Sequence, residues 1–568
     1  MAAPKTTLAG KFASGFARLT NLGKRDDDPL TNIKAATRWF ETLPIGDAFK
    51  CQQSILEELK RFNENSSELT KDRLAVLMLM DEKSRDLQDT LVRQYLRNPR
   101  MSRPVESQLW HAVYSLYWEV ARGYHAFVLQ FARGAGKSPH ENQIPLITLR
   151  AIRTFGQLLK WRAVRYLAAG EKLWLRLHNL YRVAEAEGFH RLALHAYADD
   201  TEPGTCESAY LHILMLHLAN SGTLYPKQLD LFDRWLGNWD KQLQLDTRPD
   251  VARHTFAVDL SADHGARRIR KTDTEKPIRY WATADLLASL RELQDKLREG
   301  GTPARLGLTE DARTSESLEL LDHLQHHWAA LSAREQRRAP REAVKRLVDV
   351  AHGLGTIIAQ VKSAANPATA ASPYGLGINY NEADDVQVYG FVTERTRERV
   401  SQMKMPTIIV SPDVERWVMQ DESECGYGAV VESRDKDWLR VGALLGVKSH
   451  DAPTWKLGII RRLSRLNDDT SSVGIETLAE LPSLVMLYDT ASSSGYTANG
   501  LDNSGAALPN AALWLDGQAD SVILDPVHFL PGKIFQVHGT QTPKFIALGH
   551  PIERSEGWIR VAVEPVST

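Results

Sequence analysis

The sequence is poor in cysteine and holds none of it in a metal-binding or redox pattern. Its three cysteines, Cys51, Cys206 and Cys425, lie far apart along a chain of 568 residues. Their number and spacing exclude a disulfide-rich secreted scaffold and a zinc-finger module. We therefore expect unlinked thiols in a reducing compartment.

Long apolar runs are also missing. The chain has no stretch of about 18 consecutive apolar residues, the length that a membrane-spanning helix needs. The N-terminal stretch MAAPKTTLAGKFASGF lacks the apolar core of a signal peptide. We therefore expect no membrane span, no secretion and a cytoplasmic location.

Net charge of either sign is small, since 70 Lys and Arg residues oppose 71 Asp and Glu residues. A near-neutral chain is not a whole-molecule binder of polyanions, although local basic patches remain open. The strongest such patch is the span 150–182, where a single acid, Glu171, accompanies these basic residues: Arg150, Arg153, Lys160, Arg162, Arg165, Lys172, Arg176 and Arg182. These side chains either contact nucleic acid or an acidic partner, or pair with carboxylates of their own domain. We favour the second interpretation and expect no nucleic-acid partner.

Signatures of catalytic sites are absent or incomplete. The stretch RGAGKSPH, residues 133–140, resembles the end of a phosphate-binding loop, but Phe131 stands where the first glycine belongs. The residues before it have a helical period, whereas such a loop must follow a strand. No G-x-S-x-G, H-E-x-x-H or strand-borne G-x-G-x-x-G occurs. We expect no catalytic residue and no cofactor, and we predict that the protein is not an enzyme.

Two groups of histidines have a spacing that metal sites use. His323 and His327 stand four residues apart, and His190 and His195 precede the pair Asp199-Asp200. A metal site needs at least a third ligand in reach, and the local sequence supplies none that can be recognised. We interpret these histidines as packing or surface residues and predict no metal ligands.

The first two thirds of the chain have a helical pattern. Residues 1–30 are small, polar and basic, and we interpret them as a flexible tail. Over 31–362, apolar residues recur every three or four positions, as in ILEELKRF and ATADLLASLRELQDKLREG. One island, 254–271, lacks this period and is predicted to hold a short hairpin. We found no repeat of fixed length.

The residue pattern changes in the last third of the chain. The stretch SAANPATAASPYGLG, 363–377, has the composition of a linker. Short runs rich in valine, isoleucine and leucine follow it, separated by turn residues. They predict an antiparallel β-barrel at 378–486 and further strands at 507–568. These last strands either continue the barrel or form their own small subdomain. The predicted fold class is thus multidomain: a large all-α N-terminal region, then an antiparallel β-barrel with additional C-terminal strands.

Two short motifs lie near the start of the predicted barrel. Arg395 and Arg399 have the spacing R-x-x-x-R, where the linker is expected to become the first strand. Asp421, Ser423 and Gly426 follow in the spacing D-x-S-x-x-G. A guanidinium can form paired hydrogen bonds with phosphate oxygens, bind a guanine edge or stack on its ring. A carboxylate can accept from guanine N1 and N2, and a glycine permits a tight turn.

These two motifs in this order resemble the PilZ domain, and the succession RVGALLGV, WKLGIIRRLSR and SVGIETLA fits its strands. The resemblance implies a PilZ-like barrel whose ligand is cyclic di-GMP. It implies that Arg395 and Arg399 contact phosphate and guanine, and that Asp421, Ser423 and Gly426 form the base-side wall. The helical part is similar to that of long bacterial PilZ proteins. The family's arginine motif often begins with adjacent arginines, and here Glu394 and Glu398 interrupt it instead.

The sequence therefore predicts a cyclic di-GMP receptor or adaptor in bacterial signal transduction. Ligand binding at the barrel would be coupled to a helical region that contacts an unidentified protein partner. The alternative is a scaffold protein with a degenerate PilZ barrel that binds only proteins. Binding of cyclic di-GMP to the purified protein discriminates the two.

Overall fold

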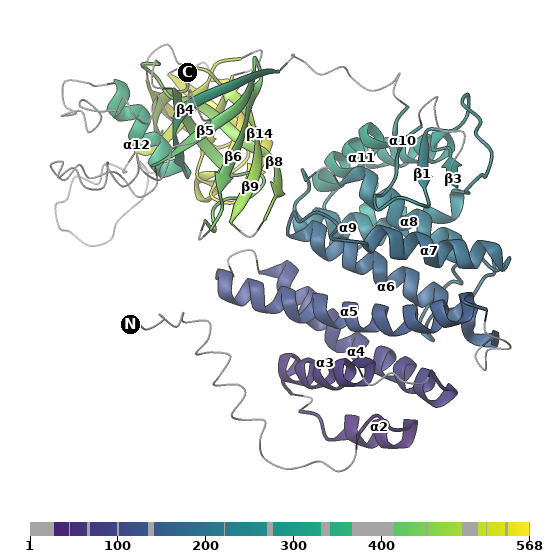
Figure 1. Ribbon diagram of the computed structural model, residues 1–568. Helices are drawn as coiled ribbons and strands as arrows, with labels where there is room; N and C mark the ends of the chain where they lie inside the picture. Colours follow the sequence, from purple (N-terminus) through teal and green to yellow (C-terminus); the bar gives the residue numbers. More distant parts are fainter. Residues whose placement is uncertain are drawn as a thin grey trace.

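Figure 1 shows a helical region followed by two β-barrels along the chain. The computed structural model describes residues 28–44, 46–64, 69–98, 101–134, 141–220, 222–269, 277–330, 341–365, 414–434, 436–449, 452–467, 469–490, 509–517, 520–539 and 544–566. The predicted fold class is confirmed, with helices first and antiparallel barrels after them. Within the described part, no helix combines the length and the apolar character that crossing a bilayer requires.

The helical region occupies the N-terminal part up to Trp328. Its helices are α2 (Ile33–Glu41), α3 (Ala48–Glu64), α4 (Lys71–Arg97), α5 (Arg103–Ala132), α6 (Ile144–Val164), α7 (Leu173–Ala186), α8 (Cys206–Ala219), α9 (Pro226–Leu236), α10 (Ala284–Arg298) and α11 (Thr314–Trp328). A small sheet of β1 (Phe256–Asp259), β2 (Arg267–Arg268) and β3 (Ile278–Trp281) interrupts them. Strand β1 pairs antiparallel with β2 inside the 254–271 segment.

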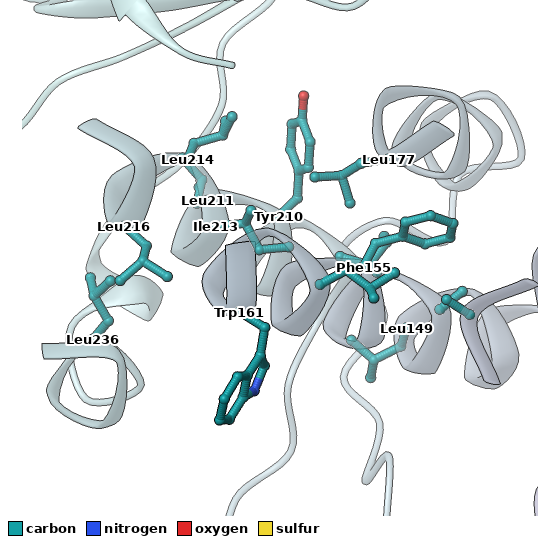
Figure 2. Close-up of a cluster of buried hydrophobic side chains, with 14 of the residues drawn as sticks. Leu149, Phe155, Trp161, Leu177, Tyr210, Leu211, Ile213, Leu214, Leu216 and Leu236 are labelled. Atoms are coloured by element: carbon teal, nitrogen blue, oxygen red, sulfur yellow. The ribbon is translucent and has the colours of Figure 1, made fainter. Parts of the chain in front are cut away.

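Helix α6 forms the centre of this region. Its Phe155 and Trp161 are almost fully buried, and side chains of α7, α8 and α9 pack around it (Figure 2). Close packing against α8 depends on Gly156, because a Cβ there would lie 2.7 Å from Ile213 Cγ1. The helical region therefore has a single large core.

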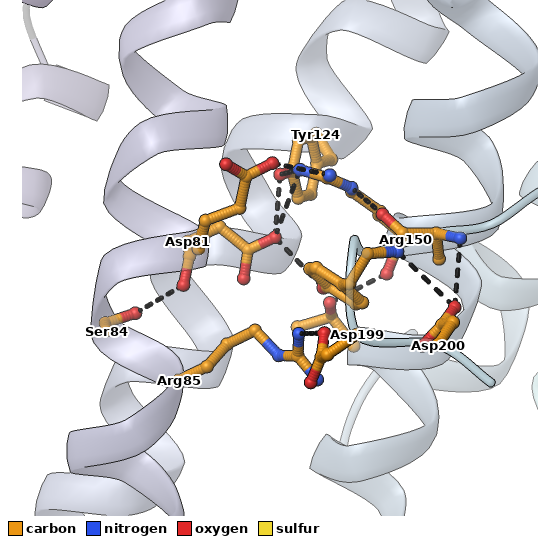
Figure 3. A network of polar contacts seen from close by, with 11 residues as sticks. Asp81, Ser84, Arg85, Tyr124, Arg150, Asp199 and Asp200 are labelled. Atoms are coloured by element: carbon orange, nitrogen blue, oxygen red, sulfur yellow. Dashed lines mark hydrogen bonds and ion pairs between the residues drawn. The ribbon is translucent and has the colours of Figure 1, made fainter.

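A buried polar network ties the first helices to α6 (Figure 3). Asp81 of α4 accepts hydrogen bonds from Tyr124 of α5, at 2.8 Å, and from Tyr197, at 3.0 Å. Arg150 of α6 donates to Glu82 at 2.7 Å and to the Ala196 carbonyl at 2.7 Å. Burial raises the pKa of Asp81, although its hydrogen bond from Tyr124 opposes that shift.

The first barrel is closed and has six strands. They are β4 (Glu342–His352), β5 (Val414–Ser423), β6 (Gly426–Glu432), β7 (Leu444–Ser449), β8 (Lys456–Arg465) and β9 (Thr470–Ala479), in the spatial order β4-β5-β6-β9-β8-β7. Strand β4 lies inside the range 31–362 that the sequence pattern assigned to the helical region. That assignment was wrong for these residues, because β4 pairs with both β5 and β7 and closes the barrel.

The second barrel is closed as well and repeats the same topology. Its strands are β10 (Ser483–Asp489), β11 (Asn510–Leu515), β12 (Ser521–Leu524), β13 (Ile534–His538), β14 (Phe545–Ser555) and β15 (Trp558–Pro565). Their order, β10-β11-β12-β15-β14-β13, is that of the first barrel with every strand shifted by six. The C-terminal strands therefore form a separate unit and do not continue the first barrel. Strand β10 belongs to this second unit, although the sequence pattern placed residues up to 486 in the first barrel.

One apolar cluster joins the two barrels. Helix α12 (Leu354–Ala365) supplies Ile357 to it, the first barrel supplies Leu444 and Trp455, and the second barrel supplies Leu513 and Trp558. The Trp558 indole also donates to the Gly442 carbonyl at 3.0 Å. The two barrels thus meet through a shared apolar cluster that is distinct from the core of either barrel.

Candidate ligand-binding site

The stretch QDESECGYG forms the hairpin between β5 and β6. Asp421 and Ser423 end β5, Gly426 begins β6, and Ser423 pairs with Gly426 across the turn. The Ser423 hydroxyl donates to the Gly426 carbonyl at 3.3 Å. In this structure the Ser423 side chain therefore helps to close the turn.

Gly426 allows β6 to approach β9. Its φ is +157°, and a Cβ at this position would lie 2.0 Å from the carbonyl oxygen of Ile475. Because that oxygen belongs to the backbone of a paired strand, it cannot move aside without breaking the ladder. Only glycine fits here.

The neighbouring Gly428 makes room for the carboxylate of Asp421. The two residues are directly paired across β5 and β6. A Cβ on Gly428 would lie 2.6 Å from each carboxylate oxygen of Asp421. The second glycine of this stretch therefore fixes the direction of the Asp421 side chain, a role that the D-x-S-x-x-G spacing does not include.

Arg341 is the charge partner of Asp421. Its Nη1 lies 2.5 Å from Asp421 Oδ1, with the two side chains 42% and 36% exposed. Arg341 directly precedes β4, and the β4–β5 pairing places Ala343 opposite Asp421. One residue further, Arg346 and Glu422 form a second ion pair at 3.1 Å. Partly exposed pairs of this kind contribute only about 0–1 kcal/mol to stability, so a ligand could replace either contact at a small cost in free energy.

Arg395 and Arg399 lie outside the described residues. They were predicted from the R-x-x-x-R spacing ahead of the D-x-S-x-x-G turn, and this stays a prediction. The expectation that the first strand of the barrel begins after them is wrong, because β4 precedes them in the chain. The first strand is β4, and the residue before it is Arg341. The sequence there reads RRAPR, residues 337–341, so Arg337 and Arg341 have the R-x-x-x-R spacing and Arg338 adjoins Arg337. This signal was missed because the residues after it were interpreted as helical.

The other motifs named from the sequence lie beside helices or contact backbone carbonyls. The half-loop motif follows the long helix α5, as predicted, while residues 135–140 are outside the described part. His323 contacts the Ala219 carbonyl at 2.9 Å, and His195 contacts the Asp200 carbonyl at 3.1 Å. Among the described residues, no group of three or more His, Cys, Asp or Glu side chains is arranged to hold a metal ion.

Most of the basic span 150–182 pairs with carboxylates of the helical region. Beside the Arg150–Glu82 pair, Arg153 lies 2.8 Å from Asp200, and Arg165 lies 3.2 Å from Glu106. Buried Lys160 lies 2.8 Å from Asp230 and 2.6 Å from Asp233. Burial would lower the pKa of Lys160, but the charges of Asp233 and Asp230 outweigh it and raise that pKa. These pairs favour the internal-pairing interpretation over a polyanion-binding surface.

The first barrel docks on the helical region through its strand β8. The Leu463 amide donates to the Gly222 carbonyl at 3.0 Å, and the Arg465 amide donates to the Tyr166 carbonyl at 2.8 Å. Gly222 has a φ of +77°, and a Cβ there would lie 2.4 Å from the Leu463 carbonyl oxygen. Tyr166 and Tyr225 of the helical region also pack against the core of the first barrel.

Comparison with known proteins gives matches over both regions. Residues 34–250 match the model of the N-terminal domain of the cyclic-di-GMP receptor FimW, and residues 377–483 match that of its middle PilZ domain. The cyclic-di-GMP receptor FimW of Pseudomonas aeruginosa is 28% identical over 193 residues. That alignment covers 33% of this chain and 31% of the relative, so it spans about a third of either protein.

Proposed function

Because this chain belongs to the PilZ-domain proteins, in a long form with a helical N-terminal region, we propose that it is a receptor for cyclic di-GMP. The observation that carries the proposal is the ion pair between Arg341 and Asp421 of the D-x-S-x-x-G turn. An arginine and a carboxylate at one end of the barrel have the complementary chemistry that a guanine-bearing phosphodiester needs.

Each side chain has a role in this proposal. The Arg341 guanidinium binds a phosphate oxygen or the O6 and N7 edge of guanine. The Asp421 carboxylate accepts from guanine N1 and N2, which requires that the ligand take over part of the contact with Arg341. Ser423 and Gly426 hold the turn in which Asp421 lies. Arg337 and Arg338 complete the arginine motif by their position in the sequence.

The proposal also includes coupling between the ligand site and the rest of the molecule. Gly426 pairs directly with Glu476 of β9. Glu476 binds Arg461 of β8 at 2.5 Å, and Arg461 also binds Glu553 of the second barrel. The end of the same strand β8 makes the backbone hydrogen bonds to the helical region. A ligand that shifts the turn would thereby favour one arrangement of the three parts, provided that it binds that arrangement more tightly. The helical region would then present a different surface to a protein partner.

Calorimetric titration of the purified chain with cyclic di-GMP tests the proposal. We expect saturable binding by the native protein, and a loss of about 2 kcal/mol in Arg341→Ala, the typical worth of a charge-assisted contact. Arg416→Ala is the matched control, because Arg416 is a half-exposed arginine of β5 that pairs with Asp349 at 3.6 Å instead. This control should bind like the native protein.

The Arg395→Ala/Arg399→Ala double variant compares the two arginine motifs directly. If it loses affinity while Arg341→Ala does not, the arginines predicted from the sequence are the ligand contacts and Arg341 is not. If the folded native protein shows no binding at all, the receptor proposal fails and the scaffold alternative remains.

A further inference from the structure

A second site candidate lies in the helical region, away from both barrels. A cavity of ≈ 270 Å³ opens between α5, α6 and α7. Its lining consists of Trp118, Arg122, His125, Phe155 and Arg176. Two guanidiniums, one imidazole and two aromatic rings thus surround one space, and of these only Arg176 belongs to a motif discussed above, the basic span 150–182.

Arg176 is the member of the basic span that lines this cavity. Its guanidinium carbon lies 5.0 Å from the ring centroid of Trp118, a cation–π contact. Within the described ranges it has no carboxylate partner, in contrast to Arg150, Arg153 and Arg165. A guanidinium that is held in place by an aromatic ring, but not neutralised, is ready to bind an anion.

Arg122 adds a second positive charge that is only partly compensated. Its Nη1 lies 3.4 Å from Glu119 Oε2, and its side chain is 44% exposed. The same carboxylate oxygen accepts a shorter hydrogen bond, 2.8 Å, from Asn63. Glu119 is therefore oriented by a buried amide, and Arg122 remains able to turn to a ligand.

His125 contributes an uncharged polar atom. Its Nε2 is buried and has no hydrogen-bond partner in the part of the chain that the structure describes. Burial, together with the positive charges of Arg176 and Arg133, lowers the pKa of His125 to about 4. The imidazole is therefore neutral at physiological pH and can form one hydrogen bond with an occupant of the cavity.

We propose that this cavity binds an anionic group, phosphate or carboxylate, that is attached to a flat apolar ring. The two guanidiniums supply charge-assisted hydrogen bonds to the anion. Trp118 and Phe155 supply flat walls for the ring, and Phe155 itself packs edge-on against His125 with ring centroids 5.7 Å apart. The volume suits one substituted ring and is too small for a folded nucleic acid.

Titration of the full-length protein with phenyl phosphate tests the ring and the anion together. Inorganic phosphate and benzyl alcohol are the two half-probes, one without the ring and one without the charge. We expect phenyl phosphate to bind at least about ten-fold more tightly than either, since two favourable contacts act together. Equal affinity for inorganic phosphate would overturn the ring part of the proposal, and equal affinity for benzyl alcohol would overturn the anion part.

Variants assign the binding to this cavity. Arg176→Gln should weaken phenyl phosphate binding about ten-fold or more, and Arg122→Gln should weaken it by a smaller factor. Arg182→Gln is the matched control, because Arg182 is exposed on the same helix and does not line the cavity. Unchanged binding in both Arg176→Gln and Arg122→Gln, with native melting curves, would overturn the proposal.

One further variant separates the two sites of the molecule. Arg341→Gln should leave phenyl phosphate affinity unchanged, since Arg341 belongs to the barrel. A loss of phenyl phosphate binding in Arg341→Gln would place the probe in the barrel and would equally overturn the cavity site.

Discussion

At the scale of single residues, the two glycines after Asp421 have different roles. A Cβ on Gly426 would meet a backbone oxygen of β9, whereas a Cβ on Gly428 would meet only the side chain of Asp421. Side chains can rotate away at little expense, but a paired backbone cannot. The first glycine is therefore needed for folding and the second for the direction of Asp421.

Gly428→Ala is expected to weaken cyclic di-GMP binding while changing stability little. The added methyl group turns Asp421 away from Arg341, and loss of one such contact is worth on the order of 1–2 kcal/mol in affinity. Calorimetry measures the affinity and thermal unfolding measures the stability. Gly426→Ala is the comparison variant and should lower the melting temperature markedly. Native affinity in Gly428→Ala would show that the ligand does not use the observed direction of Asp421.

Asp421→Asn tests the carboxylate itself. The amide keeps the size of the side chain but loses one acceptor and the charge that attracts Arg341. We expect weaker cyclic di-GMP binding and a nearly unchanged melting temperature, since substitutions at exposed ion pairs usually alter stability by less than about 1 kcal/mol. An Asp421→Asn protein with native affinity would contradict the proposed role in guanine recognition.

The sequence pattern placed Asp421, Ser423 and Gly426 together because all three belong to one local turn, the hairpin between β5 and β6. It missed Arg341, whose relation to that turn exists only through the pairing of β4 with β5. Contacts between residues so far apart in the chain are decided by tertiary structure and leave no local period. The spacing R-x-x-x-R occurs at both 337–341 and 395–399, so spacing alone could not choose between the two.

At the scale of elements, β4 is the strand that the sequence pattern misassigned. Its residues EAVKRLVDVAH mix charged and apolar positions without clean alternation. Only Val348, Val350 and Ala351 are deeply buried, near its C-terminal end. The partners β5 and β7 fix this segment as a strand, and they override its weak local preference. The sequence pattern correctly predicted β8 and β9 as strands, because their short apolar runs are bounded by turn residues.

A fragment of residues 378–568 is expected not to form the first barrel, because it follows the predicted barrel boundary and lacks β4, although the second barrel is complete in it. Without β4, the strands β5 and β7 lose their common partner and the barrel has two open edges. A fragment of residues 331–568 retains β4 and should unfold cooperatively in denaturant. Circular dichroism with urea titration compares the two. Because the second barrel is present in both fragments, hydrogen exchange of β5–β9 is measured as well, and protection of these strands in the shorter fragment would show that β4 is dispensable.

A titratable side chain, His212, joins helix α8 to helix α9. His212 of α8 lies 2.8 Å from Asp233 and 3.2 Å from Asp240. Burial would lower the pKa of His212, but its hydrogen bonds to Asp233 and Asp240 outweigh that effect and raise the pKa to about 9. The folded pKa is thus above the unfolded value of 6.5, so this contribution to stability is complete below pH 6.5 and is lost as the pH rises through about 9.

The melting temperature of the native protein should therefore fall between pH 6.5 and pH 9 more steeply than that of His212→Gln. The glutamine keeps a hydrogen-bonding side chain but does not titrate. Differential scanning calorimetry across this range, at constant ionic strength, provides the measurement. Parallel curves for the two proteins would mean that His212 is not protonated in the folded state.

At the scale of the whole molecule, two barrels of one topology lie against a helical region. The first carries the D-x-S-x-x-G turn. The corresponding connection of the second, between β11 and β12, starts with Asp516-Gly517 and has no such spacing. The repeated topology was not evident from the sequence, because topology depends on strand pairing and the two barrels share no repeated motif. The second barrel lacks this spacing and meets the first through a shared apolar cluster, so a change in the first barrel can reach the second through that cluster.

Replacement of Arg461 should interrupt the coupling between the β5–β6 turn and the second barrel. It binds Glu476, which is paired with Gly426 of the ligand turn, and Glu553 of β14 in the second barrel. Burial would lower its pKa, but the contacts with Glu553 and Glu476 raise it, so the charge is kept.

We expect cyclic di-GMP to change hydrogen exchange of β14 in the native protein and not in Arg461→Gln, with affinity altered by less than about ten-fold. Arg560→Gln is the control, because Arg560 donates to Ser521 within the second barrel at 2.9 Å, and it should preserve the response. A β14 response that persists in Arg461→Gln would mean that the shared apolar cluster, rather than this ion pair, carries the coupling.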